Sequence, residues 1–442
     1  MIAMQVPPAI RSDCGKRKKL KAKRQKKLAA SLLIFVVSVL GVSCGLTRLA
    51  VDAEASALIA AVLDAQASSS DGSDNQGTSH VPAGQLGPWV TSDVSRDLMQ
   101  VSSLSVDANA AVDAVNRAML TDPDGLGVVH VVMIVTLPSE GGDVSFPSSA
   151  RFTNMFERCM ESLLCQARRI PVHFILLTDR GSEVFFRKIV VKIAVSKSRV
   201  PVFVDAVALA DITANVTSSL ERLRSHLPST PRTKYADPLF HVGPLLPFVP
   251  LPGKPNRVLV LDVDLRFRAD ISQLRDVFEQ FGTRQAIAMA PELSPLYSKS
   301  FKAHREKFPE SKLGLPRPGY QGFNYGVALM DLGRLRSSEY YRDLVIPSSD
   351  QETTQRKDNA LANLIEKYSF QPSGVGDQDF FTLLAAERPD LFYILDCSWN
   401  VQLDLNLKSP ENSEEFERYH YCCPHNDVQV YHGNAGYPIP EN

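Results

Sequence analysis

The stretch "RVLVLDVDLRF", Arg257 to Phe267, decides the fold, because an apolar run of strand length ends in two aspartates. Burying a lone carboxylate is costly unless it is paired or bound to a cation. Side chains i and i+2 of a strand point to the same side, so we expect Asp262 and Asp264 to point together. Two such carboxylates favour a hard divalent cation. The same triplet is also typical of a loop whose carboxylates are merely solvated.

Further apolar runs of strand length surround this stretch, separated by segments with helical spacing. The apolar runs cover residues 128–135, 172–179, 200–207, 286–292 and 325–332, and the helical segments cover 147–169 and 216–226. Apolar strands that alternate with helices predict an α/β fold, in which the sheet is covered on both faces. Ligands of such sheets bind beyond the carboxyl ends of the strands. We therefore expect Thr136, Asp179 and the aspartate pair along one edge.

His432 lies near the C-terminus in "VYHGN", Val430 to Asn434, and Gly433 predicts a polar turn there. A neutral imidazole could complete a metal shell begun by Asp262 and Asp264. Carboxylates combined with an imidazole suit Mn²⁺ better than Mg²⁺, although Mg²⁺ stays an alternative. The competing interpretation is an ordinary surface histidine.

Two other motifs combine polar residues with the start of a regular element. In "VGDQDFFTLL", 375–384, Asp377 could be a helix N-cap, which leaves Gln378 and Asp379 in the first turn, where they could reach a ligand. In "GYQGFNYGVALMDL", 319–332, glycines flank Asn324 and allow close approach of the backbone to a ligand. A plain loop is the alternative for the second motif.

The N-terminal part predicts a membrane anchor. Nine of the twelve residues 16–27 are Lys or Arg, and residues 28–47 carry no charge. About 20 apolar residues span a bilayer, and the positive-inside rule keeps the basic cluster cytosolic. A cleaved signal peptide is the alternative. The predicted organisation is a cytosolic tail 1–27, a transmembrane signal-anchor 28–47, a stem of low order 48–121, and a lumenal catalytic domain 122–442.

Composition adds limits to this interpretation. The net charge of −1 over 442 residues gives the whole molecule no electrostatic reason to bind nucleic acid. Seven cysteines include five in the predicted lumenal domain, where disulfides persist, but their pairing cannot be deduced from spacing. The glycosylation sequon Asn215–Thr217 suits a lumenal location.

The segments "LDVDL", "GFNYGVALMDL", "GDQDFFTLLAAERPDLFYILDCSWNVQL" and "YHGNAGYPIPEN" together resemble glycosyltransferase family 8, over about Val128 to Asn442. The resemblance implies a GT-A (Rossmann-like) fold and a metal-dependent enzyme that retains the α configuration of its UDP-sugar donor. It implies Mn²⁺ at Asp262, Asp264 and His432. It also implies a single-pass type II protein of the endoplasmic reticulum or Golgi membrane, and leaves open whether two chains pair as a homodimer.

The resemblance further implies UDP-xylose as donor and, as acceptor, a xylose-capped O-glucose on EGF-like repeats such as those of Notch, joined by an α-1,3 linkage. The implied catalytic residues are Gln378, which would lie beside the transferred sugar, and Asp379, which would bind the hydroxyls of that sugar. The implied donor-binding residues are Ile134, Val135, Thr136, the backbone at Val263, Asn324, Tyr325 and Gln378, and the implied acceptor contact is Asn434.

Tyr325 is a departure, because the family commonly has Ser or Ala at this position. A bulky side chain in the sugar pocket would narrow it, which would suit a pentose or change the donor. One rival interpretation is therefore another family 8 enzyme that uses a glucose, galactose or glucuronic acid donor. The other is a membrane-tethered glycan-binding protein whose transferase site has decayed.

Overall fold

The computed structural model describes residues 127–136, 149–229, 237–346, 360–422 and 427–440. The predicted tail, membrane anchor and stem lie outside the described residues, so these boundaries stay predictions. None of the helices in the described part of the chain is long and apolar enough to cross a bilayer.

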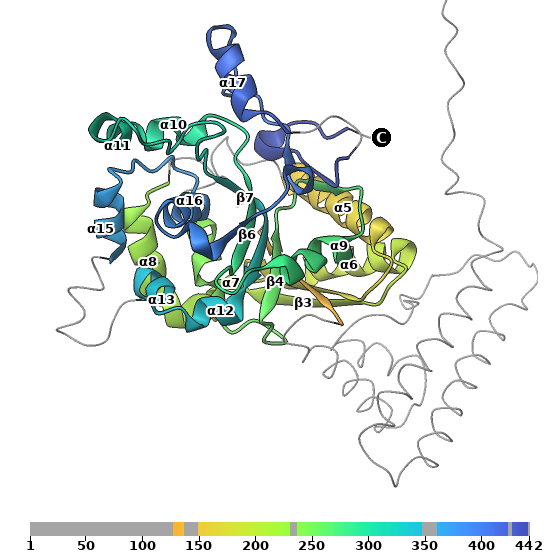
Figure 1. The fold of residues 1–442 in the computed structure, drawn as a ribbon. Helices are drawn as coiled ribbons and strands as arrows, with labels where there is room; N and C mark the ends of the chain where they lie inside the picture. The colour runs from red at the N-terminus through yellow and green to blue at the C-terminus, as the bar shows by residue number, and fades with distance from the viewer. Residues whose placement is uncertain (1–126, 137–148, 230–236, 347–359, 423–426, 441–442) are drawn as a thin grey trace, which may run out of the picture. The chain divides into compact units, whose positions relative to one another are not determined.

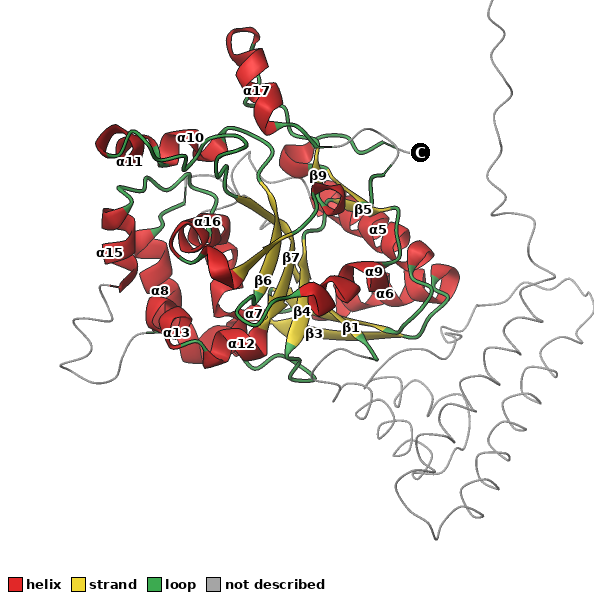
Figure 2. Cartoon of the chain, in the orientation of Figure 1, coloured by secondary structure: helices red, strands yellow, loops and turns green. Residues whose placement is uncertain are grey.

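A sheet lies at the centre of the fold and is drawn in yellow in Figure 2. It has seven strands, in the order β3-β2-β1-β4-β7-β6-β8. Its strands are β1 (Val129–Val135), β2 (Val172–Thr178), β3 (Val202–Ala208), β4 (Arg257–Leu261), β6 (Ile287–Pro291), β7 (Phe323–Asp331) and β8 (Phe392–Ile394). β7 runs antiparallel to β4 and β6, and the other pairs are parallel. The predicted α/β sheet is confirmed, and it is mixed.

Helices cover both faces of this sheet (Figure 1). One hydrophobic cluster includes α5 (Ser149–Gln166), α6 (Glu183–Lys197) and α9 (Ile271–Arg275). The other includes α8 (Thr217–His226), α12 (Leu332–Ser337), α13 (Glu339–Val345), α15 (Ala360–Lys367) and α16 (Asp377–Glu387). Alternate side chains of β1 enter the two clusters: Val131 packs with the first and Val132 with the second. This alternation explains why the strands are apolar along their whole length.

Shorter helices flank this core. They are α7 (Leu209–Thr213), α10 (Leu296–Ser300), α11 (Lys302–Lys307) and α17 (Ser413–Tyr419). α5 shows why the helical spacing was informative: Phe156, Met160, Leu163 and Leu164 recur at i, i+4, i+7 and i+8 and are all fully buried.

A second, three-stranded sheet brings distant parts of the chain together. It consists of β5 (Leu265–Phe267), β10 (Val430–His432) and β9 (Val401–Gln402), with β10 in the middle. The apolar run therefore ends at the aspartate pair, as expected, and the pair lies between two strands of different sheets. β4 ends at Leu261, and the chain bends and resumes as β5 in the other sheet.

Candidate active site

The aspartate pair lies where the chain leaves the central sheet. β1 and β4 are parallel neighbours, so Thr136 and Asp262 follow their strands at the same edge, as expected. Asp179 follows β2 at this edge too, where its carboxylate accepts a hydrogen bond from Ser182 in the turn before α6. Thr136 and Val263 are half-buried at this edge.

The donor-side residues inside β1 face opposite clusters. Ile134 is partly buried and packs toward the cluster that contains α16, whereas Val135 is fully buried in the cluster that contains α5. Their side chains therefore belong to the hydrophobic core.

Asp262, Asp264 and His432 form a cluster whose candidate ligand atoms all lie within 4.8 Å of one another. His432 Nε2 lies 3.3 Å from Asp264 Oδ1 and 3.5 Å from Asp262 Oδ2. The pairing of β10 with β5 causes this convergence, because His432 stands opposite Leu265 in the ladder. His432 is thus the last residue of a strand and 3% exposed, not a residue of a surface turn. Two carboxylates and an imidazole at this spacing fit a Mn²⁺ site.

The electrostatics of His432 point the same way. Burial lowers the pKa of its imidazole, but the nearby carboxylates, Asp264 foremost, outweigh burial and raise the pKa to about 10. The cluster therefore has a strong preference for a positive charge between its carboxylates. A cation would take the place that the proton on Nε2 otherwise holds.

Gln378 and Asp379 lie in the first turn of α16. The alternative assignment of Asp377 as N-cap is wrong, because Gly376 holds that position with φ 76°, and Asp377 is the first helical residue. Gln378 Oε1 accepts a hydrogen bond from the backbone N–H of Tyr325 at 3.0 Å. Gln378 is therefore fixed against β7, the strand that also carries Asn324.

Asp379 is fully buried, and its oxygens accept hydrogen bonds from the Ser373 hydroxyl and from the Gly374 N–H at 3.0 Å. Burial raises the pKa of its carboxyl to about 6, although these donors oppose the rise. Asp377 is buried as well, and burial followed by the charge of Asp262 raises the pKa of its carboxyl well above the usual range.

Tyr325 contributes its backbone N–H to Gln378, while its ring packs into the core. The ring stacks on Phe381 with centroids 4.9 Å apart, and its hydroxyl donates to Met330 Sδ at 3.7 Å. A Cβ on Gly243 would lie 2.5 Å from this hydroxyl, so a glycine is needed there.

Two residues of the site were not singled out from the sequence, although one of them, Glu292, lies in the segment Pro291 to Tyr297 that the family resemblance places at the acceptor side. Glu292 follows β6 and is 3% exposed, and its carboxylate accepts hydrogen bonds from Asn324 Nδ2 at 3.0 Å and Gln378 Nε2 at 3.2 Å. Burial raises the pKa of this carboxyl. Asn400 is fully buried and bonds to His432 Nδ1 at 2.9 Å. Glu292 did carry a signal, a carboxylate directly after an apolar strand, whereas Asn400 carried none.

Asn434 fastens the loop after β9 beside the cluster. Its Oδ1 accepts hydrogen bonds from the backbone N–H groups of Leu403 at 3.0 Å and Asp404 at 3.1 Å. The preceding residue, Gly433, donates its N–H to the carbonyl of Asp264 at 2.8 Å. The structure thus places the predicted acceptor contact next to the predicted metal ligands.

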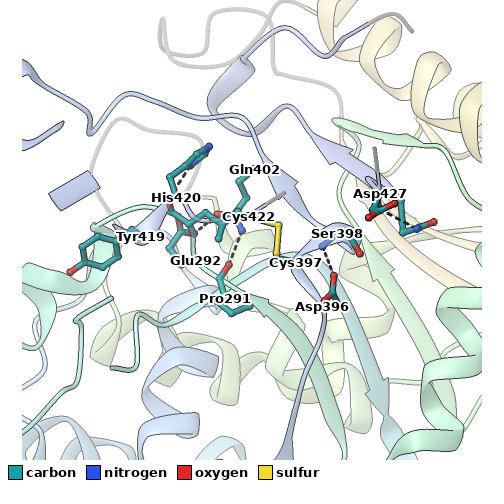
Figure 3. The surroundings of a disulfide bond; sticks show 12 residues. Pro291, Glu292, Asp396, Cys397, Ser398, Gln402, Tyr419, His420, Cys422 and Asp427 are labelled. Carbon is teal, nitrogen blue, oxygen red and sulfur yellow. Dashed lines mark hydrogen bonds between the residues drawn. A yellow bond between two sulfur atoms is a disulfide. The ribbon is translucent and has the colours of Figure 1, made fainter. Parts of the chain in front are cut away.

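A disulfide between Cys397 and Cys422 closes the chain segment that contains β9 (Figure 3). Within this segment Gln402 Nε2 donates to the carbonyl of Pro291 at 2.9 Å, and His420 Nδ1 donates to the carbonyl of Leu293 at 3.1 Å. The disulfide therefore restrains a segment that forms hydrogen bonds to Pro291 and Leu293, the two residues next to Glu292.

A mixed α/β sheet with a carboxylate–imidazole cluster beyond its central strands defines a GT-A-like nucleotide-sugar glycosyltransferase. The chain belongs to glycosyl transferase family 8, whose family model matches residues 144–425. The predicted family is thereby confirmed.

The chain is also similar to individual proteins of known class. The human protein "Xyloside xylosyltransferase 1" is 34% identical over 235 residues, which are 53% of this chain and 56% of that protein. Human "Xylosyl- and glucuronyltransferase LARGE1" is 26% identical over 269 residues, 61% of this chain and 29% of that protein. The chain thus matches about half or less of the length of these relatives. The crystal structure of mouse xyloside xylosyltransferase 1 in its apo form superposes with a TM-score of 0.59 at 27% identity, covering 71% of this chain and 100% of that one.

Proposed function

We propose that this protein transfers xylose from UDP-xylose, with retention of configuration, to the xylose-capped O-glucose of an EGF-like repeat through an α-1,3 linkage. The observation that carries the proposal is the convergence of Asp262, Asp264 and His432 at the strand edge, in a chain similar to human xyloside xylosyltransferase 1.

The metal assignment follows from the chemistry of the donor set. Asp262, Asp264 and His432 would hold Mn²⁺, which supplies positive charge that stabilises a leaving diphosphate. The cluster is open to solvent at Asp262, because the side chain of Asp262 is 54% exposed while that of Asp264 is 12% exposed.

In the proposed reaction the acceptor hydroxyl oxygen bonds to the anomeric carbon on the face from which UDP departs. The bond between that carbon and the β-phosphate oxygen breaks, its electron pair stays with UDP, and a phosphate oxygen takes the hydroxyl proton. A covalent route would need a carboxylate free to reach the anomeric carbon. Asp379 is a poor candidate, because it is buried and its oxygens are bonded to Ser373 and Gly374. Gln378, held by Tyr325 and Glu292, would orient the sugar.

The proposal includes a type II orientation in the endoplasmic reticulum or Golgi membrane, with the catalytic domain in the lumen. It is supported by the basic cluster 16–27 that precedes the apolar segment 28–47. A disulfide such as Cys397–Cys422 suits an oxidising compartment.

The test incubates the purified full-length protein with Mn²⁺, an EGF repeat that carries xylosyl-glucose, and one UDP-sugar at a time. We expect a mass gain of one pentose with UDP-xylose alone, abolished by EDTA, and removal of the added residue by an α-xylosidase. A gain from UDP-glucuronic acid would favour the second candidate donor, which the similarity to LARGE1 supports. Binding of UDP-sugars without any transfer would favour a decayed, glycan-binding protein.

A further inference from the structure

We propose that Glu292 is a positioning residue, the charged end of a hydrogen-bond relay that sets the tautomer of His432 and also holds Gln378. The relay comprises Gln378, Glu292, Asn324, Asn400 and His432. The inference rests on the proposed function, because it assumes that His432 is a metal ligand. It adds a physical connection between the metal site and the side chain that faces the transferred sugar.

Two consecutive backbone N–H groups of β7 fix the orientation of the amides next to Glu292. Gly326 N–H donates to Asn324 Oδ1 at 3.1 Å, so Asn324 presents its Nδ2 to Glu292 Oε2 at 3.0 Å. Tyr325 N–H donates to Gln378 Oε1 at 3.0 Å, so Gln378 presents its Nε2 to the same oxygen at 3.2 Å. A backbone N–H can only donate, and therefore both amides must donate to Glu292.

Asn400 links Asn324 to the candidate metal ligand His432. Asn324 Oδ1 also faces Asn400 Nδ2 at 2.9 Å, and an oxygen acceptor there requires that Asn400 donate. Asn400 therefore presents Oδ1 to His432 Nδ1 at 2.9 Å. Nδ1 must carry a hydrogen, which leaves the lone pair of Nε2 for a cation between Asp262 and Asp264.

Burial makes this relay strong. Glu292, Asn324, Asn400 and His432 are 3%, 5%, 0% and 3% exposed, so bulk water cannot replace a lost partner. Hydrogen bonds that follow one another in such surroundings polarise each other. The Ser294 hydroxyl donates to the other oxygen of Glu292 at 2.7 Å, so three donors converge on this one carboxyl group. That arrangement suits a carboxylate, whose negative charge favours the hydrogen on His432 Nδ1.

The test measures Mn²⁺ affinity without nucleotide, by electron paramagnetic resonance of the free ion with full-length protein. Asn400→Leu removes the acceptor for His432 and should weaken Mn²⁺ binding about tenfold or more. Glu292→Gln keeps the shape but removes the charge, and should weaken it several-fold from three hydrogen bonds away. Asn256→Leu is the matched control. Asn256 directly precedes β4, and its side-chain amide oxygen accepts a hydrogen bond from Arg336, so this variant should leave the Mn²⁺ affinity unchanged.

A second background isolates the relay. Asn400→Asp gives His432 Nδ1 a carboxylate as its direct acceptor. It also replaces the Nδ2 that donates to Asn324 with an oxygen, which breaks the relay at that point. In the Asn400→Asp background, Glu292→Gln should therefore have no further effect on Mn²⁺ affinity. In addition, nitrogen NMR of the wild type with Mg²⁺ should show His432 protonated at Nδ1. The opposite tautomer overturns the proposal without any variant.

The outcomes separate the relay from the metal site. If Asn400→Leu weakens Mn²⁺ binding while Glu292→Gln binds within twofold of the wild type, the relay ends at Asn400 and the proposal is wrong. If His432→Ala binds Mn²⁺ as tightly as the wild type, the imidazole is not a ligand, and the metal assignment of the proposed function falls together with the relay.

Discussion

The imidazole of His432 lies against the backbone of Gly326 so closely that a Cβ on Gly326 would come within 2.2 Å of the ring carbon Cε1. Gly326 also accepts a hydrogen bond from the N–H of Asp262 at 2.9 Å and donates its own N–H to Asn324. Glycine inside a strand weakens the strand, and it is expected where another group approaches the backbone closely. Here that group is the imidazole of His432.

Gly326→Ala should therefore displace His432. We expect Mn²⁺ affinity and transfer activity to fall at least about tenfold, as when a metal ligand is misoriented, and unfolding to be easier by about 1–3 kcal/mol from overpacking. Urea unfolding and Mn²⁺ titration measure the two effects. Gly282→Ala is the control, because its nearest neighbour is a flexible Gln285 oxygen at 3.5 Å. Unchanged Mn²⁺ binding in Gly326→Ala would contradict the arrangement described.

Asp264 is the carboxylate nearest to His432, and its replacement tests the metal assignment directly. Asp264→Ala should reduce transfer at least about 100-fold, a loss typical of a missing group that stabilises charge in the transition state. The unfolding transition should stay cooperative. Asp211→Ala, which removes an exposed carboxylate paired with Arg180, is the control and should keep full activity. Full activity of Asp264→Ala in EDTA would show that the reaction needs no metal here.

Asp379 predicts a pH dependence of stability. Burial raises the pKa of its carboxyl to about 6 in the folded protein, whereas an unfolded Asp titrates near about 3.9. Its contribution is therefore fully present below about pH 4 and is lost as pH rises through about 6, because the folded state binds the proton more tightly. The loss amounts to about 3 kcal/mol.

Asp379→Asn cannot titrate, so this contribution should vanish. Urea unfolding of the wild type and the variant at pH 4 and pH 7 isolates it, since all other groups contribute to both proteins. We expect the difference in unfolding free energy between the two proteins to change by about 2 kcal/mol over this range, because the unfolded Asp is already half ionised near pH 4. A constant difference would mean that Asp379 keeps an ordinary pKa.

Much of the central sheet followed from apolar runs, because buried strands are apolar along their whole length. The edge shared by Thr136 and Asp262 followed from the rule for strand ends. The bend at the aspartates did not, since no local pattern marks where a chain changes sheets. Asp262 and Asp264 do lie close together, as expected, but the pairing of β5 with β10 that brings His432 to them was not predictable from the pleat of one strand.

The remainder of the site depends on contacts between distant residues. β5 and β10 have three residues each, too few for periodicity to reveal. His432 was proposed as a ligand from its residue type and from the family resemblance, whereas its buried position at the end of a strand was not predicted. In sequence Asn400 lies between a short 3-10 helix (Cys397–Trp399) and β9, and only the folded chain shows that it joins His432 to Asn324.

The disulfide Cys397–Cys422 should contribute measurably to stability. It closes a loop of sequence separation 25, and such a cross-link restricts the unfolded chain enough to stabilise the fold by about 3 kcal/mol. The loop contains Asn400 and Gln402, so opening the disulfide should also weaken the hydrogen bonds of these two side chains to Asn324 and Pro291, beside Glu292. The variant with Cys397→Ser and Cys422→Ser together should lose about 3 kcal/mol in urea unfolding, and dithiothreitol should lower the wild type to the same value without changing the variant further. Equal stability of variant and oxidised wild type would show that this segment is held by its hydrogen bonds alone.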